Sequence, residues 1–121
     1  MFAAPQRLRR HGDVRRVYRR GQAIQTEHLR VHILFVNAPT PKFRATVVVP
    51  NKTLKSAVAR NRRKRQLRHA IRDLLSSTTT AADIVVVLTN APPTVSFFDL
   101  RQQLHRVFVD KGMISGQGLS L

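Results

Sequence analysis

Carboxylates are the first side chains to test for chemistry, because several of them together can hold metal ions or exchange protons. A two-metal nuclease needs several carboxylates that converge on ions about 4 Å apart. The sequence has only six acidic residues, and no two of them stand at the spacing of a ligand pair. Two of them, Asp13 and Asp99, are better explained as residues that begin helices. The six are Asp13, Glu27, Asp73, Asp83, Asp99 and Asp110.

Histidines offer a second kind of chemistry. His28 and His32 would share one face of a strand, where they could bridge a metal or form the acid–base pair of a ribonuclease. No third ligand and no positioned lysine accompanies them, so a polar strand face is the better interpretation. The chain has no cysteine, which excludes disulfides and thiolate zinc sites. We therefore expect no catalytic residue and no metal site in this chain.

Basic residues dominate the composition instead. Lysine and arginine number 22 against 6 acids, which gives a formal net charge of +16 and a sequence pI of about 12.0. Such an excess favours a polyanionic partner, with nucleic acid as the first candidate and an anionic membrane surface as the second. Seven basic residues fall in residues 7–20 and seven in residues 60–72, and the second segment contains no acid. Like charges at helical spacing destabilise a helix, so this segment indicates binding to a partner.

The helical phase of the second segment sorts its side chains. With Leu67 at the centre of the buried stripe, four residues project away from the core: Arg62, Arg65, His69 and Arg72. Three others, Arg60, Arg63 and Lys64, fall near the apolar phase. Unpaired charges are too costly to bury. We therefore expect the first turns of this helix to extend beyond the sheet and leave these three side chains free to reach phosphates.

Three segments predict strands. Residues 28–36 alternate with a period of two, as a half-buried strand does. Its apolar face holds Leu29, Val31, Ile33 and Phe35, and its polar face holds His28, Arg30 and His32. Residues 43–49 form a second strand, and the apolar run 83–88 suits an interior strand. A further short strand is expected around Ile24.

Helices are predicted over residues 13–20, 56–75 and 96–111. In the third, Ser96 and Asp99 form a capping box, and the buried residues are Phe97, Leu100, Leu104, Val107 and Phe108. These elements predict one α+β domain over residues 1–121, with a basic arm at 1–12 and a flexible tail at 113–121. No apolar run approaches the roughly 20 residues that span a bilayer. The first 20 residues carry seven arginines and do not look like a secretory signal, so a cytoplasmic location is expected.

The second basic segment resembles the signature of the bacterial ribonuclease P proteins, which is an Ala-Val pair, a variable residue, Arg-Asn-Arg and a further basic cluster on a helix. The matching residues are Lys55-Ser-Ala-Val-Ala-Arg-Asn-Arg-Arg-Lys-Arg65, followed by Leu67-Arg68-His-Ala70. Other segments are similar to the first helix, last strand and closing helix of that family. They are Arg7-Leu-Arg9 with Asp13-Val-Arg-Arg-Val-Tyr-Arg-Arg-Gly21, Asp83-Ile-Val-Val-Val87 and Ser96-Phe-x-x-Leu100.

The resemblance implies a single domain with a four-stranded sheet in the order α-β-β-β-α-β-α, and an unusual left-handed crossover through the Arg-Asn-Arg helix. It also implies that the chain is the protein subunit of ribonuclease P, an endonuclease that matures the 5′ end of tRNA. Its partners would be the ribonuclease P RNA and precursor tRNA, with no role for DNA or a membrane. The RNA, with Mg²⁺ bound mainly by that RNA, would perform the hydrolysis.

Two sets of site residues are implied in the same way. The surface for the catalytic RNA would be Arg60, Asn61, Arg62, Lys64, Arg65 and Arg68. The cleft for the single-stranded 5′ leader of precursor tRNA would include Val14, Tyr18, His32 and Lys52. Departures from the family stand at Val14, which offers only apolar contact, at Arg63, which replaces an apolar residue, and at Pro50 and Lys55. Tyr18 and His32 can still stack on bases.

We expect the chain to screen the repulsion between two RNAs, so that its effect should depend on salt. Three alternatives stay open at this point. A ribosomal or other structural RNA-binding protein would leave precursor tRNA uncut in the presence of ribonuclease P RNA. A DNA-binding regulator would place residues 56–75 in a major groove, but its outward residues are nearly all arginine and suit phosphates better than bases. A protein-only nuclease would cleave without any added RNA.

Overall fold

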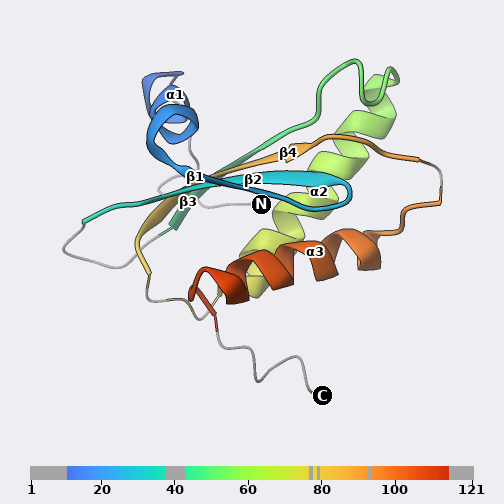
Figure 1. The fold of residues 1–121 in the computed structure, drawn as a ribbon. Helices are drawn as coiled ribbons and strands as arrows, with labels where there is room; N and C mark the ends of the chain where they lie inside the picture. Colours follow the sequence, from blue (N-terminus) through green and yellow to red (C-terminus); the bar gives the residue numbers. More distant parts are fainter. Residues whose placement is uncertain (1–10, 38–42, 77, 79, 93, 115–121) are drawn as a thin grey trace.

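The computed structural model describes residues 11–37, 43–76, 78, 80–92 and 94–114. Its elements follow in the order helix, three strands, helix, strand, helix (Figure 1). They are α1 (His11–Arg20), β1 (Gln22–Gln25), β2 (Leu29–Phe35), β3 (Phe43–Val48), α2 (Ala57–Leu74), β4 (Ala82–Leu88) and α3 (Phe97–Asp110). The α+β fold predicted from the sequence is confirmed, and so is the short strand around Ile24.

The four strands form one sheet in the order β1-β2-β4-β3. β2 pairs antiparallel with both β1 and β4, whereas β3 and β4 run parallel. The interior position of β4 explains its nearly continuous apolar run, because both of its faces are covered. A parallel pair needs a crossover connection, and α2 provides it. The left-handed sense of this crossover stays a prediction.

The main core lies between the sheet and the two longer helices, α2 and α3, which cover the same face (Figure 1). The alternating strand residues that point to this face are fully buried, and they include Leu29, Val31, Ile33, Ala45, Ile84 and Val86. The helices contribute side chains at helical spacing, among them Leu67, Ala70, Ile71, Leu100, Leu104 and Phe108. Phe35 was expected on this buried face but is 39% exposed, because it is the last residue of β2 and lies at the end of the sheet. Phe97 is only partly buried.

The other face of the sheet carries α1 alone among the described helices (Figure 1). Val17 of α1 and Val85 of β4 are completely buried against each other and form a small second core. The chain then turns sharply into β1 at Gly21, whose N–H donates to the Val17 carbonyl at 2.8 Å. A Cβ on Gly21 would lie 2.5 Å from the Val17 oxygen and 3.0 Å from the Ile33 oxygen, so only glycine fits.

Both ends of the domain differ from the prediction. α1 begins within the expected basic arm, and the rest of that arm, residues 1–10, lies outside the described residues. Met113 was expected in a flexible tail, but it is 3% exposed and its carbonyl accepts a hydrogen bond from Thr78 at 2.8 Å. Its apolar side chain joins the core, whereas residues 115–121 lie outside the described part. No helix within the described residues is long and apolar enough to cross a membrane.

Candidate nucleic-acid interface

The amino-terminal half of α2 stands clear of the core. The buried side chains of this helix are Leu67, Ala70 and Ile71, all in its second half. Ser56 caps the first turn, where its Oγ accepts a hydrogen bond from the Ala59 N–H at 3.2 Å. The first turns therefore extend beyond the buried stripe, as the helical phase predicted.

The exposed side of α2 is positively charged. The four residues predicted to project away from the core are all exposed, namely Arg62, Arg65, His69 and Arg72. Of the other residues implied by the resemblance, Asn61 is exposed, while Lys64 and Arg68 are half-buried. Asp73, the acid closest in sequence, forms an ion pair with Arg101 of α3 at 2.7 Å. The exposed side of α2 therefore presents a field that attracts a polyanion.

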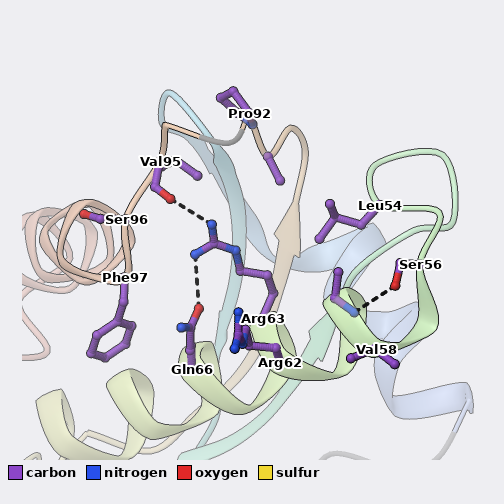
Figure 2. Close-up of a pocket in the computed structure, with 12 residues that line it drawn as sticks. Leu54, Ser56, Val58, Arg62, Arg63, Gln66, Pro92, Val95, Ser96 and Phe97 are labelled. Carbon is purple, nitrogen blue, oxygen red and sulfur yellow. Dashed lines mark hydrogen bonds between the residues drawn. The ribbon is translucent and has the colours of Figure 1, made fainter.

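Arg60 and Arg63 are bound to the protein itself, so the expectation that they are free to reach phosphates is wrong. The Arg60 guanidinium donates to the carbonyls of Leu54 and Lys55, both at 2.8 Å. The Arg63 guanidinium donates to the Val95 carbonyl at 2.7 Å and to Oε1 of Gln66 at 3.1 Å (Figure 2). Backbone carbonyl oxygens of the loop before α2 and of the loop before α3 therefore accept hydrogen bonds from these two cations, which would otherwise need water as their partner. Both arginines fasten those loops to α2.

On the opposite face of the sheet, three of the predicted cleft residues come together. The rings of Tyr18 and His32 meet edge to face, with centroids 4.7 Å apart and planes at 77°. Tyr18 is 42% exposed, so part of its ring is open to a ligand, whereas His32 is 9% exposed. Val14 packs against the small core of Val17 and Val85. The fourth residue, Lys52, is exposed in the turn after β3.

A row of side chains continues this face of the sheet, and sequence reasoning did not place it in the site. In the strand register, Arg30 of β2 lies opposite Gln25 of β1 on one side and opposite Val87 of β4 on the other. Val87 in turn lies opposite Val48 of β3. Arg30 is exposed, and its Nε donates to the Gln25 side chain at 2.9 Å. The sequence shows that Arg30 and His32 lie on the same face of β2, but only the strand register places Val87 and Val48 on the neighbouring strands beside Arg30. Apolar contact next to a cation suits a base and its phosphate.

A chain of charges holds α1 over this face. The Arg44 guanidinium makes two hydrogen bonds to the buried Asp83 carboxylate, at 2.8 and 2.7 Å. It also lies 3.6 Å from a carboxylate oxygen of Asp13 on α1, and Asp13 accepts from Arg16 at 2.6 Å. The hydrogen bond to Asp83 is the main reason that the pKa of Arg44 is raised. Arg44 therefore ties the start of α1 to the end of the sheet.

The shifts in the pKa values of Tyr18 and His32 favour the neutral form of both rings. Burial lowers the pKa of His32, and the nearby Arg30 lowers it further. Burial also raises the pKa of the Tyr18 phenol. Near neutral pH both rings are therefore uncharged, which suits stacking against a base better than binding a phosphate.

His28 does not share a site with His32. Its Nδ1 lies 2.8 Å from the amide nitrogen of Gln103, a buried residue of α3, and its backbone N–H donates to the Gln103 Oε1 at 3.0 Å. It therefore belongs to the face that α3 covers, whereas His32 lies beneath Tyr18 on the other face. The alternative of a metal-bridging or acid–base histidine pair is wrong for these two residues.

These features define a small, strongly basic α+β domain with exposed cations on helices that cover opposite faces of its sheet. A family model described as Ribonuclease P matches residues 2–111 of the chain. A ribonuclease P protein component from a Pseudanabaena species is 34% identical over 116 residues, which covers 96% of this chain and 99% of that protein. The protein of the same name from Rhodococcus opacus is 34% identical over 86% of each chain.

Solved structures of ribonuclease P proteins have the same fold. The Staphylococcus aureus RNase P protein superposes with a TM-score of 0.76 at 23% identity, covering 89% of this chain and 96% of that one. The Thermotoga maritima RNase P protein gives a TM-score of 0.69 at 25% identity, covering 84% of this chain and 93% of that one. The chain belongs to the Ribonuclease P family, and the resemblance seen in its sequence is confirmed.

Proposed function

We propose that this chain is the protein subunit of a cytoplasmic ribonuclease P. It binds the catalytic RNA along α2 and holds the single-stranded 5′ leader of precursor tRNA in the cleft beside α1. It thereby promotes endonucleolytic 5′ maturation of tRNA, and the RNA subunit performs the hydrolysis.

The observation that carries this proposal is the position of the two basic helices on opposite faces of one sheet. The arginines of α1 that are exposed are Arg15, Arg16, Arg19 and Arg20. α2, which carries the second set of exposed cations, covers the opposite face of the sheet together with α3. A domain with this arrangement can lie between two RNA segments and neutralise phosphates on both. Such neutralisation lowers the repulsion between the segments and releases counterions.

The leader cleft is supported by the kind of side chains it exposes. The partly open ring of Tyr18 offers a stacking surface. The half-buried Val87 lies opposite Arg30 in the sheet, and Val48 lies opposite Val87 on the next strand. Stacking is tolerant of sequence because every base has a π-face. The cleft is therefore suited to leaders of varied sequence.

We assign the Mg²⁺ that the reaction needs to the RNA, and four of the six carboxylates of this chain have structural partners instead. Asp13 and Asp83 are bound by arginines, Asp73 pairs with Arg101, and Asp99 accepts from the backbone N–H of Ser96. In this proposal the chain contributes binding and positioning, and the RNA performs the hydrolysis.

Reconstitution with a ribonuclease P RNA at low Mg²⁺ tests the proposal, with 5′ maturation of a precursor tRNA as the readout. The full chain should accelerate cleavage, and Arg62→Ala and Arg65→Ala should each weaken binding to the RNA. Each variant should also reduce the salt dependence of binding by about one phosphate contact. Arg106→Ala on α3 removes the same charge from an exposed position and is the matched control. Failure to promote cleavage, with intact RNA binding, would favour a structural RNA-binding protein.

The leader cleft is tested by Tyr18→Ala. Loss of one stacked base costs about 1–3 kcal/mol. The affinity for a precursor with a leader should therefore fall at least fivefold, while the affinity for mature tRNA stays the same. Phe98→Ala, which removes another exposed aromatic ring on α3, is the control. Equal losses for precursor and mature tRNA would contradict the leader assignment.

A further inference from the structure

A cavity of about 590 Å³ opens beside the first turns of α2 (Figure 2). Its walls come from the loop before α2, from α2 itself and from the segment that joins β4 to the start of α3. They are lined by Leu54, Ser56, Val58, Arg62, Arg63 and Gln66, and by Pro92, Val95 and Phe97 among others. This volume lies within the range of about 300–1,000 Å³ that is typical of ligand sites. No acidic residue stands among the described residues that line it, and its exposed cation is Arg62.

Arg63 is the central side chain of this cavity. Figure 2 shows its guanidinium reaching from α2 toward Val95, with Val58 and Phe97 on opposite sides of it. The hydrogen bonds to Val95 and Gln66 fix the position of the guanidinium plane. A guanidinium plane held in this way is a ready platform, because unpaired RNA bases stack on arginine as they do on aromatic rings.

The mouth of the cavity combines an apolar and a charged group. Val58 is 78% exposed, the most exposed large apolar side chain among the described residues. Arg62 follows it one helical turn later, on the same side of α2, and is also exposed. An apolar contact next to a free guanidinium matches the base and the phosphate of one nucleotide, since phosphates prefer arginine forks and bases prefer stacking and apolar walls.

We propose that this cavity receives one unpaired nucleotide of the RNA that binds along α2. The base stacks on the guanidinium of Arg63 and contacts Val58, and the phosphate of the same nucleotide pairs with Arg62. This inference rests on the proposed binding of RNA to α2 and deepens it. A site of this kind would distinguish an unpaired nucleotide, whose base can enter the cavity, from a duplex, which presents only its backbone.

The test compares two ligands of equal charge by residue-resolved NMR on the full chain. One is a hexaadenylate RNA, and the other is an abasic ribose-phosphate hexamer. The hexaadenylate should shift the side-chain amide of Gln66 and the backbone amides of Val58 and Phe97, whereas the abasic chain should shift only the signals around Arg62 and Arg65. Identical shifts from both ligands would overturn the proposal, because they would mean binding through phosphates alone.

Signals from Tyr18 and His32 separate this proposal from the function proposed above. Shifts in the cleft without shifts in the cavity would overturn the nucleotide site and leave the leader cleft intact. If RNA moved neither set of signals, both proposals would be overturned. A response confined to the cavity would support the nucleotide site and contradict the leader cleft.

Two variants and a control complete the test. Arg63→Lys keeps the charge but removes the planar stacking surface, and Arg106→Lys makes the same change at an exposed position of α3, outside the cavity. Arg63→Lys should reduce the preference for hexaadenylate over the abasic chain about tenfold, the typical factor for one stacked base, and Arg106→Lys should leave it unchanged. Val58→Ser changes only an exposed side chain, so it should fold normally and reduce the preference severalfold. If both Val58→Ser and Arg63→Lys retained the full preference, the proposal would be overturned.

Discussion

Removal of Arg44 should destabilise the domain far more than removal of an ordinary surface arginine. Arg44→Met takes away both hydrogen bonds to Asp83, a carboxylate that is 1% exposed in the interior strand β4. The carboxylate cannot regain water without opening the sheet. The same substitution removes the contact with Asp13, which holds the start of α1.

The size of the effect follows from the burial of the two partners. Breaking a buried ion pair by removing one partner costs about 3–5 kcal/mol. The Arg44 side chain is itself 37% exposed, so water already screens part of the interaction. We therefore expect a loss of about 2–3 kcal/mol in the free energy of unfolding. For a domain of this size that loss corresponds to a fall in Tm of roughly 10 °C.

Urea denaturation of three variants measures the effect. Arg44→Met should show the full loss, and the double substitution Arg44→Met with Asp83→Leu should return to within about 1 kcal/mol of the native chain, because an apolar pair can replace a buried ion pair. Arg16→Met breaks the exposed pair with Asp13 and should cost at most about 0.5 kcal/mol. Arg44 does not compensate a buried charge if Arg44→Met lowers the free energy of unfolding no more than Arg16→Met does, or if the double variant is less stable than Arg44→Met.

Three further outcomes are expected. Gly21→Ala should lower the free energy of unfolding by about 1–3 kcal/mol, because its Cβ meets two backbone carbonyls, whereas Gly12→Ala on α1 meets open space and should be neutral or slightly stabilising in the same denaturation assay. Burial is the main cause that lowers the pKa of His32 and of His105 below the ordinary value of 6.5, and a neighbouring arginine lowers each pKa further. The unfolded chain therefore takes up these protons first, so stability measured by thermal melts should fall as the pH drops below about 6.5, and less steeply in His32→Gln. RNA binding followed by filter retention should weaken by about 10³–10⁵ between about 50 and 200 mM salt if six to ten phosphates are neutralised, and a flat response would argue against phosphate recognition.

Features set by neighbouring residues were predictable from the sequence. The capping box of α3 is an example, because both of its hydrogen bonds join Ser96 and Asp99, three residues apart. The exposed position of Arg62 and Arg65 followed from the helical period and one assumed buried residue, Leu67. The alternation in β2 similarly identified the side of the strand that faces the core.

Features that depend on distant backbone groups were not predictable. Arg63 donates to the carbonyl of Val95, 32 residues away, and a carbonyl has no signature in a sequence because every residue carries one. The contact of His28 with Gln103 spans 75 residues and separates it from His32. Strand register is likewise not predictable from local sequence, because it depends on segments that are far apart in the chain. Arg44 faces Asp83 only because β3 and β4 pair in parallel across the α2 crossover.

The arginines of α2 have two roles that depend on each other. A helix end without core contacts would be free to fray, and the like charges on it would favour fraying. Arg60 and Arg63 oppose this, since their hydrogen bonds fasten the first turns to the loops on both sides. The exposed Arg62 lies between them in the sequence, on the turns that these hydrogen bonds hold. The arginines bound to the protein's own backbone therefore position the turns that carry the exposed cations proposed to bind RNA, and Arg60→Ala would report on this positioning as much as on any phosphate contact.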